Sequence, residues 1–132
     1  MQVSDPPFYK PVQSLSIDPT DPNVLYSDNG GVIRTTDGGG SWHRIDGSLL
    51  QLESHAKVAR VTFANNKLYA SSTNFVMGDQ TYYSQGGLYI SANAGESWSM
   101  LGTFQIGATG PGEITPDPIN PSEIFLCTMT GI

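Results

Sequence analysis

The sequence predicts an all-β protein built from repeated four-stranded antiparallel units, and two observations carry this prediction. The first is a turn motif that occurs twice, at residues 35–42 (TTDGGGSW) and, 56 positions later, at residues 91–98 (SANAGESW). The second is composition, because 15 of the 132 residues are Gly and 9 are Pro, whereas only 14% are charged. A chain of this composition suits short strands joined by many turns.

Both copies of the motif share one order of residue types: a hydroxyl residue, Asp or Asn, Gly, Ser and Trp. A turn between antiparallel strands leaves backbone N–H groups without ladder partners, and the side chain of Asp37 or Asn93 can accept hydrogen bonds from them. Because Asn cannot exchange a proton, we expect a structural role for the motif rather than a catalytic or metal-binding one. Its structural residues are Thr35, Asp37, Gly39 and Trp42 in the first copy and Ser91, Asn93, Gly95 and Trp98 in the second.

The first unit is predicted at residues 12–46, after an extended, Pro-rich segment at residues 1–11. Its four strands are expected at residues 12–17, 24–27, 31–36 and 41–45. The run at residues 18–23 (DPTDPN) consists of residues that favour turns, and we expect a turn there. Short connections between consecutive strands indicate an antiparallel meander.

The same order of strands recurs in a second unit at residues 57–103, with strands expected at residues 57–63, 67–71, 88–92 and 97–101. Between the two units, Leu49, Leu50 and Leu52 suggest a short helical turn. A third, partial unit is expected at residues 113–132, where residues 117–121 echo the first turn and residues 123–128 echo a second strand.

Units of about 40 to 50 residues with four strands and a Gly and Trp signature are typical of β-propeller blades. A β-sandwich is the alternative, but its strands do not repeat in sequence, so the repeat favours the propeller. About two and a half blades form an incomplete ring, because propellers need roughly four to eight. We therefore expect the remaining blades to come from the same longer chain or from other copies.

The repeated motif resembles the Asp-box, or BNR repeat, of sialidases, xyloglucan-cleaving glycoside hydrolases, sortilin-type receptors and photosystem assembly factors. The resemblance implies a propeller in which the motif is structural, and it favours an extracellular or cell-surface location. The start of the chain has no signal-peptide pattern. A sialidase needs three arginines that clamp a carboxylate, and the three arginines of this chain all fall on predicted strands, which disfavours that activity.

Charge, apolar run length and ligand spacing argue against several classes of partner and cofactor. The formal net charge is −6. No Lys or Arg cluster could neutralise phosphates, which argues against nucleic acid. No run is long enough to insert into a membrane, and His43 and His55 have no ligands at zinc spacing. We expect no metal and no cofactor. The single cysteine, Cys127, lies in an apolar run and is predicted to be buried.

The connection between the second and third strands swells in the second unit, where it covers residues 72–85. In a meander blade this connection lies on the rim opposite the repeated motif. Long loops on a rigid scaffold often carry binding residues, and the candidates here are Phe75, Asp79, Gln80, Tyr82 and Tyr83. Aromatic faces beside amide and carboxylate groups suit a sugar ring. The same residues could instead fold the loop onto its own blade.

Asp28 is a candidate catalytic carboxylate, because residues 26–34 (YSDNGGVIR) resemble the stretch of the xyloglucan-cleaving hydrolases in which an Asp precedes Gly-Gly. That resemblance implies a catalytic role, and the alternative is that Asp28 caps a turn. Glycoside hydrolysis needs two carboxylates, and Asp79 is the only acid of the swollen loop that could be the second.

Two functions follow from these features. The first is a recognition or scaffold module that binds a glycan or a protein through the rim bearing Asp28 and residues 72–85. The second is part of a glycoside hydrolase that acts on a β-glucan-type polysaccharide such as xyloglucan. Whether the chain is an enzyme stays open at this point, because Asp-box propellers host both functions.

Overall fold

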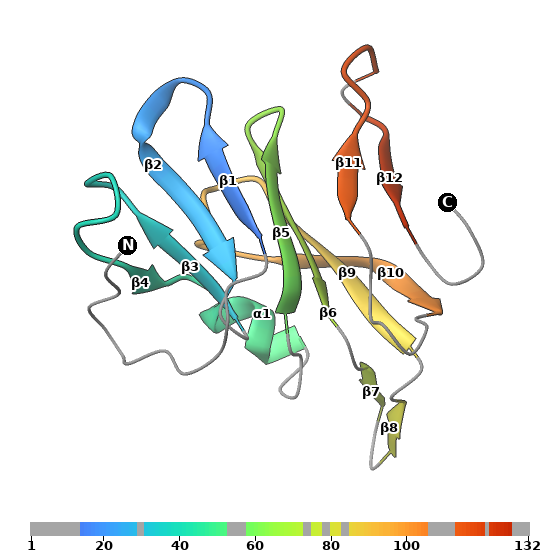
Figure 1. Ribbon diagram of the computed structural model, residues 1–132. Helices are drawn as coiled ribbons and strands as arrows, with labels where there is room; N and C mark the ends of the chain where they lie inside the picture. The colour runs from blue at the N-terminus through green and yellow to red at the C-terminus, as the bar shows by residue number, and fades with distance from the viewer. Residues whose placement is uncertain are drawn as a thin grey trace.

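The computed structural model describes residues 14–28, 31–52, 58–72, 75–77, 80–82, 85–105, 113–120 and 122–127. They form two four-stranded antiparallel sheets and two separate hairpins (Figure 1). The first sheet has the strand order β1-β2-β3-β4, and the second has the order β5-β6-β9-β10. Both sheets are meanders, as the sequence predicts, because hydrogen-bonded neighbours follow one another along the chain apart from the inserted β7–β8 hairpin.

The strands of the first sheet are β1 (Leu15–Asp18), β2 (Asp21–Asp28), β3 (Val32–Thr35) and β4 (His43–Arg44). Those of the second are β5 (Val58–Ala64), β6 (Lys67–Ser72), β9 (Gln85–Ser91) and β10 (Ser99–Gln105). The hairpins are β7 (Phe75–Met77) with β8 (Gln80–Tyr82), and β11 (Ile114–Pro116) with β12 (Ile124–Leu126). The expected helical turn is α1 (Gly47–Leu52), whose Leu49 is fully buried. Within the described part of the chain, this six-residue helix is much too short to span a membrane.

The first turn is tighter than the six residues predicted from composition. β1 ends at Asp18 and β2 begins at Asp21, and these two residues pair in register. The Asp18 carboxylate accepts hydrogen bonds from the backbone N and the hydroxyl of Thr20, at 2.8 and 2.7 Å. The Asp18 side chain thus satisfies the backbone N–H of the turn residue Thr20. The second strand can therefore begin at Asp21, directly before Pro22.

Asp117 repeats this role in the third unit. Its carboxylate accepts from the N–H groups of Ile119 and Asn120, at 2.7 and 3.1 Å. These backbone bonds lower the pKa of Asp117 below its ordinary value. The echo between residues 18–22 and 117–121 therefore has a physical basis in a shared carboxylate cap.

Three observations correct the sequence predictions. Residues 72–85 are not a plain loop, since they contain the β7–β8 hairpin, with Phe75 paired to Tyr82 and Met77 to Gln80. β10 continues past Thr103 to Gln105 because β9 extends back to Gln85 and pairs with it. Cys127 is exposed rather than buried, because the β11–β12 hairpin has no further strand covering this side among the described residues.

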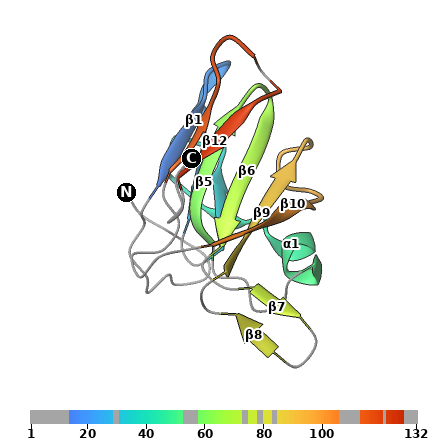
Figure 2. The ribbon, with the colours of Figure 1, turned by 90° about the vertical axis from the view of Figure 1, so that its right-hand side faces the viewer.

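The first strands of the three units, β1, β5 and β11, lie side by side and point the same way (Figures 1 and 2). Side-chain hydroxyls connect them: Ser14 Oγ accepts from Val61 N and Ser16 Oγ from Phe63 N, each at 2.9 Å. The Tyr26 ring of the first sheet stacks on Phe63 of the second, with 5.1 Å between ring centroids. One apolar core joins residues of both sheets with Leu49 of α1 and Trp98 of the second repeated turn: Val24, Tyr26, Val32, Leu49, Val58, Val61, Leu68, Ala70, Tyr89 and Trp98.

Radially packed four-stranded meanders whose first strands lie side by side are β-propeller blades. The chain contains two of these blades and the first hairpin of a third. The sheets of the described residues do not close into a ring. The turns β1–β2, β5–β6 and β11–β12 lie at one end of the sheets, and α1 and the β7–β8 hairpin lie at the other (Figure 1).

Candidate functional site

The two repeated turns, residues 35–42 and 91–98, are closed networks of hydrogen bonds. Asp37 Oδ1 accepts from the Thr35 hydroxyl at 2.7 Å and from Ser41 N at 2.8 Å, and Asp37 Oδ2 accepts from the Ser41 hydroxyl at 2.7 Å. These bonds, first that from Thr35 and then those from Ser41, lower the pKa of Asp37 to about 2. The carboxylate therefore accepts hydrogen bonds from within its own turn.

The second turn reproduces this network with an amide. Asn93 Oδ1 accepts from Ser97 N at 2.9 Å, and Asn93 Nδ2 donates to the Ser97 hydroxyl at 2.7 Å. Gly95 N donates to the Ser91 hydroxyl at 2.9 Å, and Gly95 has a φ of 90°. Its counterpart Gly39 has a φ of 99°, so both positions use the positive φ that favours Gly.

The two Trp side chains of the turns are buried in the body of the protein. Trp42 is fully buried and Trp98 is 6% exposed. Trp98 Nε1 donates to Ile45 O at 3.0 Å, which connects the second turn to the first blade. Both Trp side chains therefore contribute to packing inside the protein.

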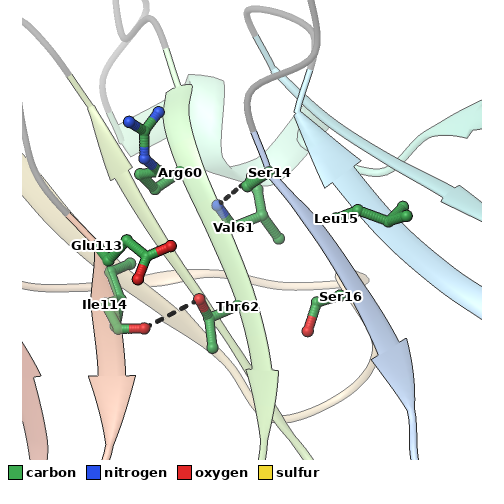
Figure 3. Close-up of a pocket in the computed structure, with 8 residues that line it drawn as sticks. All are labelled: Ser14, Leu15, Ser16, Arg60, Val61, Thr62, Glu113 and Ile114. Atoms are coloured by element: carbon green, nitrogen blue, oxygen red, sulfur yellow. Dashed lines mark hydrogen bonds between the residues drawn. The ribbon is translucent and has the colours of Figure 1, made fainter.

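A cavity of about 300 Å³ lies between the first strands of the three units (Figure 3). It is lined by Ser14, Leu15, Ser16, Arg60, Val61, Thr62, Glu113 and Ile114. The hydroxyls of Ser14, Ser16 and Thr62 and two charged side chains make this lining mainly polar. In a complete propeller the first strands surround the central channel, and here the first strands β1, β5 and β11 each supply residues of the cavity lining.

The polar residues of the cavity occupy matching positions in the repeat. Ser14 precedes Leu15 in the first unit as Arg60 precedes Val61 in the second and Glu113 precedes Ile114 in the third. Figure 3 shows the Glu113 side chain reaching from β11 toward β5, and the Arg60 side chain on the side of β5 that faces β11. Thr62 Oγ1 donates to Ile114 O at 3.2 Å and joins the same two strands. One position of the repeat thus brings a hydroxyl, a cation and a carboxylate around one cavity.

Asp28, the last residue of β2, contacts the cavity residue Ser14. It is 2% exposed, and its carboxylate accepts a hydrogen bond from the hydroxyl of Ser14. Ser14 Oγ in turn accepts from Val61 N, and the Ser27 hydroxyl donates to Ser14 O at 2.5 Å. Asp28 therefore orients a cavity residue and helps to connect the first blade to the second.

The other predicted site residues fall in or beside the β7–β8 hairpin. Asp79 and Tyr83 lie outside the described residues, so the pairing of Asp28 with Asp79 stays a prediction. Phe75, Gln80 and Tyr82 are described as strand residues only, and their side chains lie outside the description. The hairpin lies at the end of the sheets where β1, β5 and β11 begin (Figure 1).

Sequence reasoning did not predict the cavity residues Arg60 and Glu113. The first strands of the three units nevertheless align in the sequence. Comparing residues 14–16 with 60–62 and 113–115 would have shown one outward position that changes from Ser to Arg to Glu. Such variation at a repeated position is the signal that was available.

Comparisons with known proteins give likenesses among solved structures alone. No family model matches the chain, and no curated protein matches it significantly. Among solved structures it is similar to YCF48 from Cyanidioschyzon merolae, with 16% sequence identity and a TM-score of 0.44. The match covers 85% of this chain and 49% of the other, so the chain spans about half the length of that structure.

Proposed function

We propose that the chain is a recognition module on Asp-box β-propeller blades, and that it binds a polar partner, a glycan or a protein segment, at the rim where the cavity opens. The carrying observation is the cavity lined by the hydroxyls of Ser14, Ser16 and Thr62 together with Arg60 and Glu113. The repeated turns support the Asp-box assignment, because their residue order and their local hydrogen bonds fit that motif.

The lining suits polyhydroxylated or carboxylate-bearing ligands. Hydroxyl and carboxylate side chains exchange hydrogen bonds with sugar hydroxyls, and the planar guanidinium of Arg60 can hold a ligand carboxylate with two parallel bonds. The size also fits, because small-molecule pockets begin at about 300 Å³. The described lining contains a cation, Arg60, and an anion, Glu113. An acidic sugar unit could bind the first, and a polar or basic peptide side chain could bind the second.

The test is direct binding with matched variants. The purified chain would be screened against an array of neutral and acidic oligosaccharides and polar peptides, and any hit would be titrated by calorimetry. We expect Arg60→Met to weaken binding of an acidic hit at least about tenfold, because a charge-assisted hydrogen bond is lost. Lys67→Met removes an exposed cation at the start of β6, at the opposite end of the sheets, and should leave binding unchanged. Equal affinity of both variants and the parent would contradict the cavity as the site.

Glycoside hydrolysis is the alternative function, and it rests on the resemblance of residues 26–34 to the xyloglucan-cleaving hydrolases, since Asp28 is 2% exposed and contacts the cavity lining through the Ser14 hydroxyl. In this proposal Asp28 and Asp79 are the two carboxylates of the reaction. Incubation with xyloglucan oligosaccharides would test it, with products measured by chromatography. Release of shorter oligosaccharides that stops in Asp28→Asn would support hydrolysis, and intact substrate with the parent chain would reject it.

A further inference from the structure

In each of the three units the first strand pairs with the second in an antiparallel way. Equivalent positions of the units can therefore be compared. Antiparallel pairing joins the outward residue of each first strand to an aromatic residue of the second strand, and these pairs are Ser16 with Tyr26, Thr62 with Tyr69, and Thr115 with Phe125. Residues directly opposite each other in a sheet share a face. Each unit therefore carries a hydroxyl and an aromatic ring on the face turned to the next unit.

The contact between the first two units shows what this face does. The hydroxyl of Ser16 accepts from the backbone N of Phe63, and the ring of Tyr26 stacks on the side chain of Phe63. Tyr26 is 1% exposed, and Val61 on the receiving strand is 2% exposed. The outgoing face of one unit thus covers the receiving strand of the next.

The receiving face of the first unit is open. Leu15 and Ile17 of β1 correspond to Val61 and Phe63 of β5, yet Leu15 is 50% exposed and Ile17 is 53% exposed. Ile114, the equivalent of Leu15 in the third unit, is 4% exposed because β11 packs against the second blade. Leu15 and Ile17 lie on the edge strand β1, and among the described residues no preceding unit covers them. This explains why they are exposed while Ile114 is buried.

The outgoing face of the third unit is open as well. Phe125 corresponds to Tyr26 and Tyr69, which are 1% and 4% exposed, but Phe125 itself is 45% exposed. Its register partner Thr115 is also exposed. The third unit thus exposes a hydroxyl and an aromatic ring, those of Thr115 and Phe125. The first unit exposes β1, the equivalent of the strand that such a pair covers between the first two units.

We propose that these two faces bind each other between copies of this chain, head to tail. The Phe125 ring of one copy packs on Ile17 of the next, and the Thr115 hydroxyl accepts from the backbone N–H of Ile17, as Tyr26 and Ser16 do at Phe63. This interface would repeat the contact that already exists between the first two blades. Every copy has the same sequence, so every copy carries both of the matching faces. A heterologous contact of this kind builds a ring when the rotation closes and an open chain when it does not.

Light scattering across protein concentration tests assembly. We expect the parent chain to pass from 14.2 kDa to integer multiples of that mass as concentration rises. Because each copy carries a formal charge of −6, assembly should strengthen with added NaCl, which screens the repulsion. A monomeric mass at every concentration and salt level would overturn the proposal.

Complementary variants test the head-to-tail geometry. Ile17→Glu destroys the receiving face and Phe125→Glu destroys the outgoing face, so each variant alone should remain monomeric. A one-to-one mixture of the two should form a heterodimer of twice the monomer mass, because one intact face of each kind remains. Failure of the mixture to pair would overturn the proposal.

A matched control guards against a general effect of surface charge. Ile119 is 84% exposed in the third-unit turn and lies on neither face, so Ile119→Glu should assemble like the parent. Circular dichroism and a thermal unfolding curve would establish that each variant is folded. Loss of assembly in Ile119→Glu as complete as in Phe125→Glu would contradict the assigned faces.

Discussion

At the scale of single residues, the acidic side chains differ in what they contact: some accept hydrogen bonds within a turn, and others lie at or beside the cavity. Asp37 accepts three hydrogen bonds from two neighbours in its own turn, and Asn93 takes the same place in the second copy. Asp28 is buried against Ser14, whereas Glu113 is exposed at the cavity. The chemistry available to a carboxylate therefore depends on which groups already use its oxygens.

The pKa of Asp37 predicts an acid-dependent loss of stability. Its pKa in the folded state is about 2, below the ordinary value of 3.8, so the stabilisation is complete above about pH 4 and is lost as pH falls toward 2. Asp37→Asn keeps the acceptor, as Asn93 does, but cannot titrate. We expect the difference in melting temperature between the parent and this variant to be constant above pH 4 and to change in the variant's favour between pH 4 and pH 2.

Thermal unfolding followed by circular dichroism across this pH range measures that difference, and an NMR titration measures the pKa of Asp37 directly. An Asp37 carboxyl that titrates at its ordinary value would contradict the prediction, because the hydrogen bonds from Thr35 and Ser41 would then not favour the ionised form.

At the scale of elements, hydroxyl side chains on first strands connect blades that share no backbone ladder. Ser14 accepts from Val61 N across 47 residues of sequence, and Thr62 donates to Ile114 O across 52. The receiving residue of β11 that matches Phe63 is Pro116, which has no N–H to donate. This explains why Thr62 bonds to a carbonyl where Ser16 accepts from an amide.

Ser14→Ala should cost more stability than Ser16→Ala. Removing the Ser14 hydroxyl takes a donor from a buried carboxylate, Asp28, and an acceptor from Val61 N, for which we expect a loss of about 2 kcal/mol in the free energy of unfolding. Ser16→Ala removes one short bond, that from Phe63 N, and should cost about 1 kcal/mol. Urea denaturation measures both, and equal losses would argue against the contact between Ser14 and Asp28.

At the scale of the whole molecule, the three units are unevenly supported. The two complete blades share one core, whereas the third unit is a two-stranded hairpin with Phe125 exposed. An isolated hairpin is marginally stable in water. The third unit therefore depends on its contacts with β5 and β6.

Hydrogen exchange should follow this order. We expect the amides of β11 and β12 to lose protection first and those of β6 and β9 in the centre of the second sheet to lose it last, because local opening needs the least free energy where few apolar contacts are buried. Exchange measured by NMR or mass spectrometry on dilute, monomeric protein would test this. Protection of the β11–β12 hairpin equal to that of β6 and β9 would contradict it.

The sequence by itself determined the strand order, the two repeated turns and the roles of Asp37 and Asn93. The two turns depend on hydrogen bonds between residues two to four positions apart, so the residues beside one another in the chain encode them. The strand order follows from the short connections between consecutive strands. Only the tertiary structure decided which side chains share the cavity, since Ser14, Arg60 and Glu113 come from three units and meet only when the first strands pack. The same packing buried Asp28 and exposed Cys127, because burial depends on what covers a residue and not on the residues beside it.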